Sequence, residues 1–405
     1  MGQSTFPVPS SGSSTSTILP VNASSVILDG SLTSASTYTT TVNGNGGIAY
    51  LTATDNAATF TIGGNTQTVQ ANSTAATTAV VGSGVSVTVA ANYGTINPTF
   101  TTSTISSADS WQAVAYGLIG ATGYYVAIAQ GTTAVSYSTN GTSWTASTMP
   151  SSKNWNGIAY GSGRFMAVAS SGSTGYGAYS TNGTTWTASN MPSASAWYSI
   201  CTSGSKWIAT TSAVGTAAAI STNGTTWSAV TLPNASATYG SSAYGNGTFV
   251  VISRNLAAAA YSTNGTTWTV TSMPYDTSWF CVTYGNGVFV ALDNNAGTKI
   301  SAYSYDGIFW NAARNDYNVN GWYSIAYGNG FFVAVQGVTT TASYSTNGIN
   351  WYSMTMPSSF QWTGVAYGNA KFVSVANSQL SAAYTTLSQV MPVNFGIYNG
   401  PATIN

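Results

Sequence analysis

Six copies of one short motif, each ending in Trp, recur along this chain at a nearly constant interval. The clearest copy reads AYSTNGTTWT and spans residues 260–269. Successive motif tryptophans lie 41 or 42 residues apart, at Trp144, Trp186, Trp227, Trp268, Trp310 and Trp351. A regular period of about 20–50 residues indicates copies of one supersecondary unit, each too small to bury its own apolar face. The period therefore restricts the fold to an array of similar units packed on one another.

A second aromatic marker opens each unit, and the chain contains seven of them: Trp111, Trp155, Trp197, Tyr239, Trp279, Trp322 and Trp362. Between marker and motif lie I-A-Y-G-N-G-x-F-V-A-V and a variable loop. We predict four strands per unit, which in the fourth unit span 240–244, 249–252, 257–262 and 267–271. Y-G-N-G and T-N-G form the turns, since Gly and Asn tolerate positive φ. Four short strands per unit predict a blade of a β-propeller.

The mismatch between seven markers and six motifs predicts how the ring closes. The last unit, from Trp362, has no motif Trp after its third strand. Phe100, in contrast, stands 11 residues before the first marker, as Trp144 stands 11 residues before the second. We therefore expect residues 98–104 to supply the missing fourth strand of blade seven. Such a strand exchange closes the ring and removes two open sheet edges.

We predict an all-β chain in four parts. An extended N-terminal arm covers 1–20, a small antiparallel β-sandwich 21–97, a seven-bladed propeller 98–388 and a C-terminal tail 389–405. The sandwich is inferred from short alternating segments separated by turn residues. Its candidate strands span 25–28, 37–42, 48–52, 58–62, 66–70, 78–81 and 85–90.

The S-T-N-G-x-x-W core of the motif resembles the Asp box of sialidase-like (BNR) repeats, which reads S-x-D-x-G-x-T-W. Asn replaces the family's Asp in five copies, one spacer residue is missing, and only Asp306 keeps the acid. The resemblance implies a structural turn between the third and fourth strands, remote from chemistry. An Asn side chain can bond the turn's own backbone, and the aromatic can pack between blades. The predicted anchors are Phe100, Trp144, Trp186, Trp227, Trp268, Trp310 and Trp351.

The composition excludes several classes of function. Charged residues make up 3% of the chain, against about 25% in a typical soluble domain, and seven basic residues balance seven acidic ones. No basic cluster is present to neutralise phosphates, so nucleic-acid binding is not expected. With no His, and with Cys201 and Cys281 in non-adjacent units as buried free thiols, we expect no cofactor and no His/Cys metal site. An oxygen-ligated Ca²⁺ at Asp293, Asn294 and Asn295 stays open.

The sequence offers no catalytic residues for the chemistry that the resemblance raises. Sialidases use an Arg triad, a Tyr/Glu nucleophile pair and an Asp acid. This chain has no Glu and only three Arg, which are Arg164, Arg254 and Arg314. The predicted strand order assigns these three Arg to opposite faces of the propeller. No pair of acids at glycosidase spacing can be identified either. We therefore predict that the protein is not an enzyme.

Loops that vary between units gather on one face, opposite the repeated turns, and variable loops on a rigid scaffold commonly carry recognition. Tyr beside Asn and Asp suits a sugar, because the ring stacks and the short polar groups bond hydroxyls. The candidate ligand-binding residues are Tyr176, Arg254, Asn255, Tyr275, Asp276, Asp293, Asn295, Lys299, Arg314, Asp316 and Tyr317.

The overall organisation resembles that of bacteriophage virion proteins. It predicts a head fibre, decoration protein or tail adhesin, with residues 1–97 docking on other virion proteins and the propeller facing a host-surface glycan. We expect a homo-oligomer located in the virion, since the N-terminus lacks the pattern of a signal peptide. No apolar run reaches the ~20 residues of a membrane helix, so membrane insertion is not expected. An Asp-box-type glycoside-active enzyme and an exported bacterial lectin remain alternatives.

Overall fold

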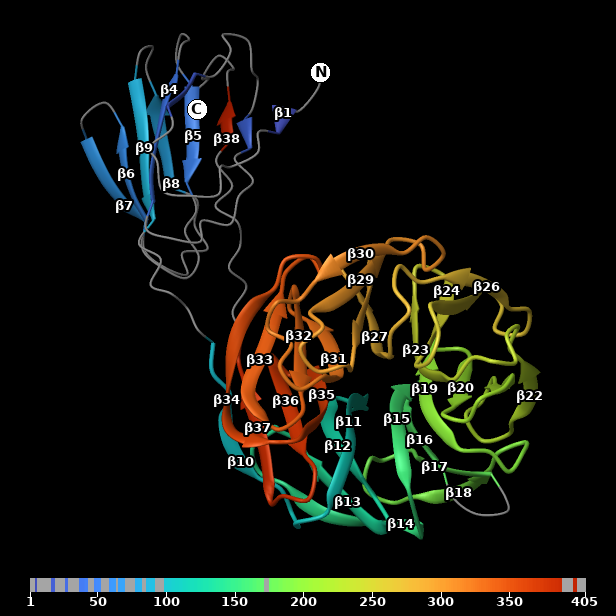
Figure 1. Cartoon of the computed structure of the whole chain (residues 1–405). Helices are drawn as coiled ribbons and strands as arrows, with labels where there is room; N and C mark the ends of the chain where they lie inside the picture. The colour runs from blue at the N-terminus through green and yellow to red at the C-terminus, as the bar shows by residue number, and fades with distance from the viewer. Residues whose placement is uncertain are drawn as a thin grey trace. The chain divides into compact units, whose positions relative to one another are not determined.

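The computed structural model describes residues 98–170 and 175–387 in full and, outside them, the backbone of strands β1–β9 and β38. The chain divides into two compact units (Figure 1). One comprises Met1–Ile96 with Ser388–Asn405, and the other comprises Asn97–Leu387. No helix occurs among the described residues, and none of them forms a helical segment able to cross a membrane.

The larger unit is a seven-bladed β-propeller, as predicted (Figure 1). Each blade is a four-stranded antiparallel sheet, and its strands are named A to D from the centre outward. In that order the blades are: blade 1, β11 (Ser110–Ile119), β12 (Thr122–Gln130), β13 (Thr132–Ser138) and β14 (Thr145–Lys153); blade 2, β15 (Trp155–Gly161), β16 (Arg164–Ala169), β17 (Tyr176–Ser180) and β18 (Thr187–Asn190); blade 3, β19 (Trp197–Thr202), β20 (Trp207–Thr211), β21 (Ala217–Ser221) and β22 (Ser228–Thr231); blade 4, β23 (Tyr239–Gly245), β24 (Thr248–Ser253), β25 (Ala258–Ser262) and β26 (Thr269–Ser272); blade 5, β27 (Trp279–Gly285), β28 (Val288–Asp293), β29 (Ile300–Ser304) and β30 (Asn311–Arg314); blade 6, β31 (Trp322–Gly328), β32 (Phe331–Gln336), β33 (Thr339–Ser345) and β34 (Tyr352–Phe360); blade 7, β35 (Trp362–Gly368), β36 (Lys371–Ala376), β37 (Ser381–Thr385) and β10 (Thr101–Thr104).

Blade seven is completed from the other end of the chain, which confirms the predicted strand exchange. Strand β10 pairs antiparallel with β37, so that Thr101 lies opposite Tyr384 and Thr104 opposite Ser381. Just before β10, the backbone N–H of Phe100 donates to the carbonyl oxygen of Thr355 in blade six at 2.8 Å. The closing segment therefore bonds to two blades, and the edge of β37 is covered.

Seven apolar clusters hold the ring together, and each is shared by two neighbouring blades. The seven marker aromatics lie at the centre of these clusters and are at most 1% exposed. The predicted motif anchors also lie between blades, but most contribute less buried surface than expected. Phe100, Trp268 and Trp351 are buried, whereas the other four motif tryptophans are only half-buried. Apolar contact between blades thus depends first on the markers.

The motif itself forms the turn that joins strands C and D, as its resemblance implied. In blade one, Asn140 Oδ1 accepts the backbone N–H groups of Thr142 and Ser143, both at 2.9 Å. Ser138 Oγ accepts the N–H of Gly141 at 2.8 Å. The same contacts recur in the other copies, and in blade five Asp306 takes the place of Asn. The motif is a self-bonded turn, and its Ser and Asn are used within it.

A Y-G pair at or near the end of the A strand forms a joint between blades in six of the seven blades, and in blade three Thr202 and Ser203 stand in its place. A Cβ atom added at Gly285 would lie 2.0 Å from the ring of Tyr327 in the next blade, and one at Gly368 would lie 2.0 Å from the ring of Tyr116. Contacts that short do not occur between real atoms. The glycine is therefore required by the tyrosine of the neighbouring blade, which explains why the two residues recur together.

The A–B turn of blade seven contains a strained residue. Five A–B turns place two successive residues at positive φ, and in four of them the second residue is Gly. In blade seven that position is Ala370, at φ 58°. A left-handed conformation costs an L-residue other than Gly about 1–2 kcal/mol. Replacing the residue by Gly removes this strain, but it also makes the unfolded state more flexible, which offsets part of the gain in stability. We expect Ala370→Gly to raise the free energy of unfolding by about 0.5–1 kcal/mol.

Urea unfolding of the full chain checks this expectation, with Gly330→Ala as the converse variant at the same turn position of blade six. Gly330 has φ 82°. Gly330→Ala should lower the stability. Equal midpoints for wild type and Ala370→Gly would contradict the proposed strain.

The strands of the smaller unit follow the predicted segments closely. They are β1 (Ser4–Thr5), β2 (Ser16–Ile18), β3 (Val26–Ile27), β4 (Ser36–Val42), β5 (Gly47–Leu51), β6 (Ala58–Ile62), β7 (Asn65–Val69), β8 (Thr77–Val81), β9 (Val85–Ala91) and β38 (Gly396–Tyr398). They form sheets in the orders β2-β4-β9-β6-β7, β38-β5-β8 and β1-β3. Packing of these sheets into a sandwich involves side chains outside the described residues.

The two ends of the chain differ from the arm and the tail that the sequence predicts. Within 1–20, β1 pairs with β3 and β2 pairs with β4, both in parallel. Within 389–405, β38 pairs with β5, so that Ile397 lies opposite Ala49. Because these partners are distant in the sequence or pair in parallel, no turn pattern could indicate the pairing.

Candidate functional site

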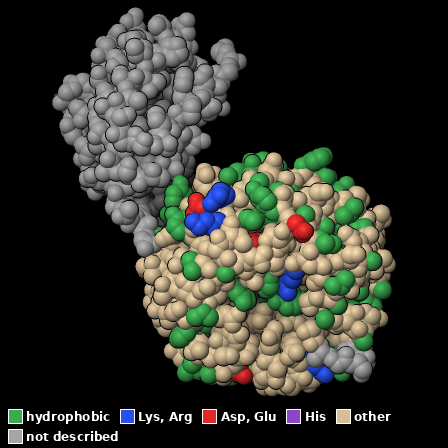
Figure 2. Space-filling view, viewed as in Figure 1, with side chains coloured by type: hydrophobic (Ala, Val, Ile, Leu, Met, Phe, Trp, Pro, Cys, Tyr) green, Lys and Arg blue, Asp and Glu red, His purple; other side chains and the backbone are tan. Residues whose placement is uncertain are grey.

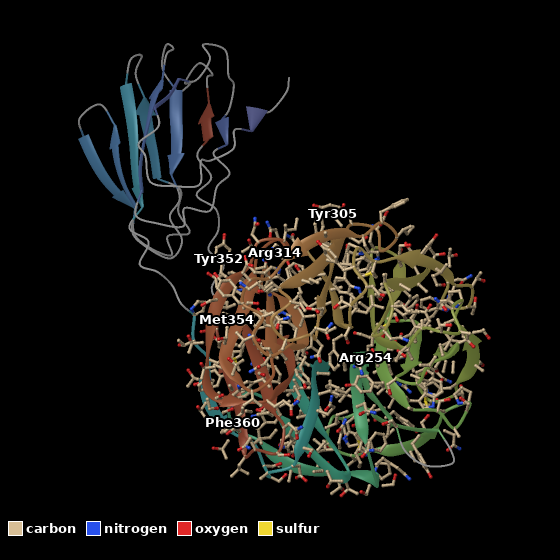
Figure 3. All side chains as sticks on the ribbon, viewed as in Figure 1. Arg254, Tyr305, Arg314, Tyr352, Met354 and Phe360 are labelled. Carbon is tan, nitrogen blue, oxygen red and sulfur yellow. The ribbon has the colours of Figure 1, made fainter. Side chains whose placement is uncertain are left out.

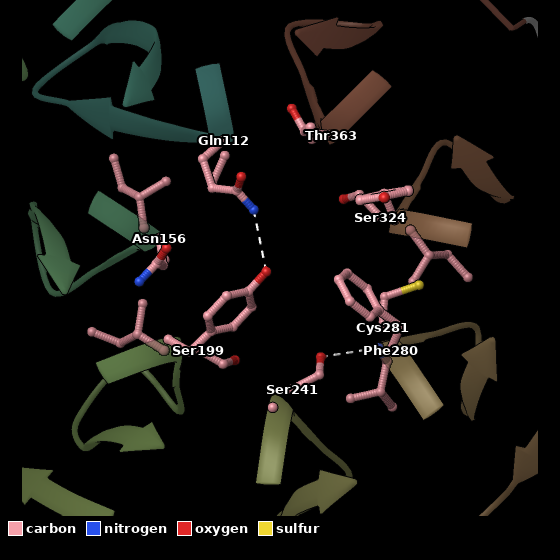
Figure 4. A pocket seen from close by; sticks show the side chains of 18 of the residues that line it. Gln112, Asn156, Ser199, Ser241, Phe280, Cys281, Ser324 and Thr363 are labelled. Atoms are coloured by element: carbon pink, nitrogen blue, oxygen red, sulfur yellow. Dashed lines mark hydrogen bonds between the residues drawn. The ribbon is translucent and has the colours of Figure 1, made fainter. Parts of the chain in front are cut away.

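A cavity of about 170 Å³ lies on the propeller axis (Figure 4). It is lined by residues from the A strands of all seven blades and by one residue from outside them, Arg254. Its polar lining includes Gln112, Asn156, Ser199, Ser241, Ser324 and Thr363. This cavity, and not the variable loops, is where side chains from every blade converge.

A bulge at the start of every A strand directs one side chain toward the axis. In each blade the A–B register shifts directly after the marker, for example between Trp155 and Gly157 in blade two. A bulge leaves one residue unpaired and re-aims its side chain. The skipped residues all line the cavity, and they are Gln112, Asn156, Tyr198, Gly240, Phe280, Tyr323 and Thr363. The sequence did not predict this ring of residues. Its signal in the sequence is that the residue directly after each marker changes from blade to blade, whereas the marker itself is almost always Trp.

Arg254 lies in this cavity, although the sequence assigned it to a variable surface loop (Figure 3). It directly follows β24, and its guanidinium carbon is 3.9 Å from the ring centroids of both Tyr198 and Phe280. The two rings are nearly perpendicular, at 80°, and form a corner around the cation. Gly240 leaves room for it, because a Cβ there would lie 2.1 Å from Nε of Arg254.

The positive charge of Arg254 has no acidic partner among the described residues. No Asp lines the cavity, and the ion pairs that the structure shows involve other residues. Nε and Nη2 of Arg254 are buried without a hydrogen-bond partner. Arg254 is partly buried, and each aromatic face returns about 0.5–2 kcal/mol to it, depending on how far the site is desolvated. The cavity therefore retains an uncompensated positive charge.

Hydroxyl groups add further donors to the cavity. Ser241 Oγ accepts the backbone N–H of Val282, and Ser324 Oγ accepts that of Val365, both at 3.2 Å. Each hydroxyl still has its own proton to donate. Other lining residues are used to join blades: Thr363 Oγ1 donates to the carbonyl of Trp111 at 2.7 Å. With Arg254, the cavity is rich in donors and suited to a ligand that accepts hydrogen bonds.

The thiols provide no nucleophile at neutral pH. Cys281 lines the cavity, and its pKa is raised mainly by burial, with Arg254 lowering it and Asp293 raising it to smaller extents. Burial also raises the pKa of Cys201 to about 12, against a small lowering by Ser242. Both are free and buried, as the sequence predicts. Among the described residues, no group of three or more Asp, Glu, His or Cys could hold a metal ion.

Asp293 is a buried structural acceptor, which corrects its assignment as a ligand-binding residue. It is fully buried, and its carboxylate accepts hydrogen bonds from Thr277 Oγ1 at 2.9 Å, from Thr298 Oγ1 at 2.7 Å and from Asn318 Nδ2 at 3.2 Å. Asn295 joins the same cluster through Thr277. These hydrogen bonds fasten three loops together.

The other predicted site residues stay dispersed, and Arg314 lies toward the outer edge of the propeller, whereas Arg254 lies near its middle (Figure 3). Asp316 pairs with Arg314 at 3.1 Å and with Lys299 at 3.9 Å, all well exposed. The face of the propeller that Figure 2 shows carries few charged groups, and one of them is a basic side chain in the central hollow. The remaining predicted residues contact their own surroundings: Tyr176 lies beneath Lys153, Asn255 bonds Thr238 and Ser236, Tyr275 and Asp276 are exposed, and Tyr317 packs at the edge of an inter-blade cluster.

Asp293 and Asp306 predict the pH dependence of stability. Burial raises the pKa of Asp293, and the hydrogen bonds from Thr298, Thr277, Asn295 and Asn318 oppose part of the shift. From about pH 4 upward, the folded state therefore keeps a proton that the unfolded state has lost, and stability falls as pH rises. The chain contains no His and no Glu, so few other groups titrate in this range. Urea midpoints between pH 4.5 and 7 should show this slope in the wild type and lose it in Asp293→Asn.

The exposed Asp276 provides the control, since Asp276→Asn should keep the slope.

Asp306 affects stability only at acidic pH. Although desolvation raises its pKa, hydrogen bonds from the backbone of Phe309 and Ile308 and from Ser304 lower it overall. Its contribution is present above about pH 4 and is lost as pH falls through the lowered pKa. A wild-type stability that rises from pH 4.5 to 7 would contradict the burial of Asp293.

Comparisons with known proteins support the fold. No family model matches the sequence, and no curated protein matches it. The chain is similar in structure to virginiamycin B lyase from Staphylococcus aureus, with a TM-score of 0.61, 12% identity and coverage of 71% of this chain and 99% of that chain. It is also similar to YCF48 bound to D1 peptide, with a TM-score of 0.56, 12% identity and coverage of 71% and 95%. Similarity at this identity confirms the propeller fold alone.

Proposed function

We propose that this protein is a non-enzymatic recognition protein of a bacteriophage virion, and that its propeller binds a host-surface glycan in the axial cavity. The observation that carries the binding proposal is Arg254, held in an aromatic corner with an unpaired charge. No acidic side chain among the described residues neutralises this group, so an anionic group of a ligand would compensate its charge. The predicted binding face therefore moves from the variable loops to the axis.

The chemistry of the cavity supports binding without turnover. General acid–base catalysis needs a titratable group with a pKa near the working pH. No carboxylate and no imidazole line the cavity, and the one thiol has a pKa far above neutrality. Virginiamycin B lyase is by its name an enzyme, but at 12% identity its activity does not carry over to this chain.

The division of the chain supports the virion proposal. Residues 1–96 and 388–405 form one compact unit and the propeller forms the other, so docking and recognition can reside in separate units. A charged fraction of 3% makes the surface insensitive to salt and pH. We retain the expectation that residues 1–97 dock on other virion proteins and that the protein is a homo-oligomer. Mass spectrometry of purified particles tests the location, and absence from every virion would exclude it in favour of an exported lectin.

Binding is tested with the full chain on a glycan array and on host-envelope extract. We expect retention by the wild type, at least tenfold weaker retention of Arg254→Met, and no change for Arg314→Gln. Arg314 is the matched control, since it is an exposed cation outside the cavity. Retention that survives Arg254→Met but is lost in Arg314→Gln would return the site to the variable loops. Release of a reporter from a glycoside substrate would contradict the non-enzymatic proposal.

A further inference from the structure

We infer that the axial cavity selects an acidic sugar, whose single carboxylate pairs with the guanidinium of Arg254. This inference rests on the proposed function and specifies its ligand. It concerns three features of the cavity: one uncompensated cation, a lining rich in donors, and aromatic rings beside a space of limited volume.

The charge of the cavity favours a monoanion. Arg254 is the one cation that lines it among the described residues, and no Asp lines it. One carboxylate would neutralise the site, whereas a phosphate dianion would leave one negative charge without a partner. A hydrogen bond between the guanidinium and a carboxylate is charge-assisted, and such bonds are roughly twice as strong as neutral ones. A neutral ligand would leave the cation unpaired.

Arg254 is fixed in position before any ligand arrives. Tyr198 and Phe280 hold the guanidinium from two directions at 3.9 Å, and Gln112 Nε2 donates to the hydroxyl of Tyr198 at 3.2 Å. Tyr323 continues the aromatic wall, with its ring centroid 5.3 Å from that of Phe280. A side chain held in this way loses little conformational freedom on binding, which favours affinity.

The rest of the lining suits a sugar ring. A volume of about 170 Å³ is smaller than the ~300 Å³ at which pockets for drug-sized ligands begin, so the cavity admits a single small ring. The hydroxyls of Ser241 and Ser324 keep protons to donate to ring or hydroxyl oxygens. Phe280 and Tyr323 offer apolar surface to the C–H groups of such a ring. A peptide carboxylate shares the charge but brings only one carbonyl and few further acceptors.

The test is isothermal titration of the full chain with D-glucuronate and D-glucose, which differ in the carboxylate. N-acetylalanine and its amide represent a peptide end. We expect glucuronate to bind at least tenfold more tightly than glucose and more tightly than N-acetylalanine. Arg254→Met should remove the preference for glucuronate, and Arg314→Gln should keep it. Since Met retains an apolar stem and removes a partly buried, unpaired charge, the thermal midpoint of Arg254→Met should not fall.

A second variant tests the position of the cation and not merely its presence. Gly240→Ala keeps Arg254 but places a Cβ atom 2.1 Å from the present position of its Nε, so the guanidinium must move. This variant should therefore also lose the preference for glucuronate. A preference for glucuronate that survives Arg254→Met overturns the inference. So does equal affinity for glucose, tighter binding of N-acetylalanine, or no binding of any probe. In that case, glycan retention on the array that depends on Arg254 would still support the proposed function. If retention on the array did not depend on Arg254, both the proposed function and this inference would be contradicted.

Discussion

Replacing Phe100 by Ala is expected to lower the free energy of unfolding by about 3–5 kcal/mol. Phe100 is 3% exposed and lies in the cluster between blades six and seven, which includes Met354, Trp362 and Phe372. It is also the residue at which the closing segment bonds to Thr355 before β10 begins. Its loss would leave a cavity and loosen the one strand that closes the ring, so both the core and the edge of β37 are affected.

Urea unfolding of the full chain measures this effect, and Phe309→Ala is the matched control. Phe309 is 75% exposed, so the same substitution there should change stability by no more than about 0.5 kcal/mol. The Phe100→Ala protein should also aggregate more readily once β37 is uncovered. If the two variants unfolded at the same urea concentration, the exchanged strand would not hold the ring closed.

The second large effect separates the two sets of aromatic residues. Trp197, a marker, and Trp227, a motif residue, lie in the same cluster between blades two and three. Trp197 is fully buried, and its Nε1 donates to the carbonyl of Ser193 at 3.1 Å, whereas Trp227 is half-buried and its Nε1 has no partner. Trp197→Ala should cost about 3–5 kcal/mol, and Trp227→Ala should cost less, because part of the Trp227 side chain is exposed to solvent in the folded state.

Because both residues belong to one interface, differences between blades do not enter the comparison. Thermal unfolding followed by circular dichroism, together with urea midpoints, gives the two changes. A larger loss for Trp227→Ala would restore the motif tryptophan as the principal anchor and contradict the order proposed here. Equal losses would indicate that the hydrogen bond of Trp197 and its deeper burial contribute nothing.

The fold could be predicted from the sequence because its determinants are local and repeated. A period of 41 or 42 residues and strand-length apolar runs identify the blades, while Asn-Gly turns fix their hairpins. The unequal numbers of markers and motifs locate the exchanged strand, since Phe100 occupies the position of a motif Trp. Pairing of β38 with β5 could not be predicted in this way, because it joins residues from opposite ends of the chain.

The site could not be predicted because its geometry depends on contacts between strands. A one-residue bulge after each marker turns the next side chain to the axis, and alternation patterns do not show such a bulge. Arg254 follows β24 and would be expected at the surface, but the missing side chain of Gly240 lets it turn inward. Asp293 similarly gains its burial from Thr277, Thr298 and Asn318, which come from three different loops.

The most direct test of the axial site is the affinity of the full chain for D-glucuronate in the wild type, in Arg254→Met and in Arg314→Gln. Arg254 lines the cavity, whereas Arg314 is exposed at the end of β30, beside a loop that the sequence alone would favour. We predict at least a tenfold loss of affinity in Arg254→Met and none in Arg314→Gln. Unchanged affinity in Arg254→Met together with a loss in Arg314→Gln would contradict an axial site and place recognition on the variable loops.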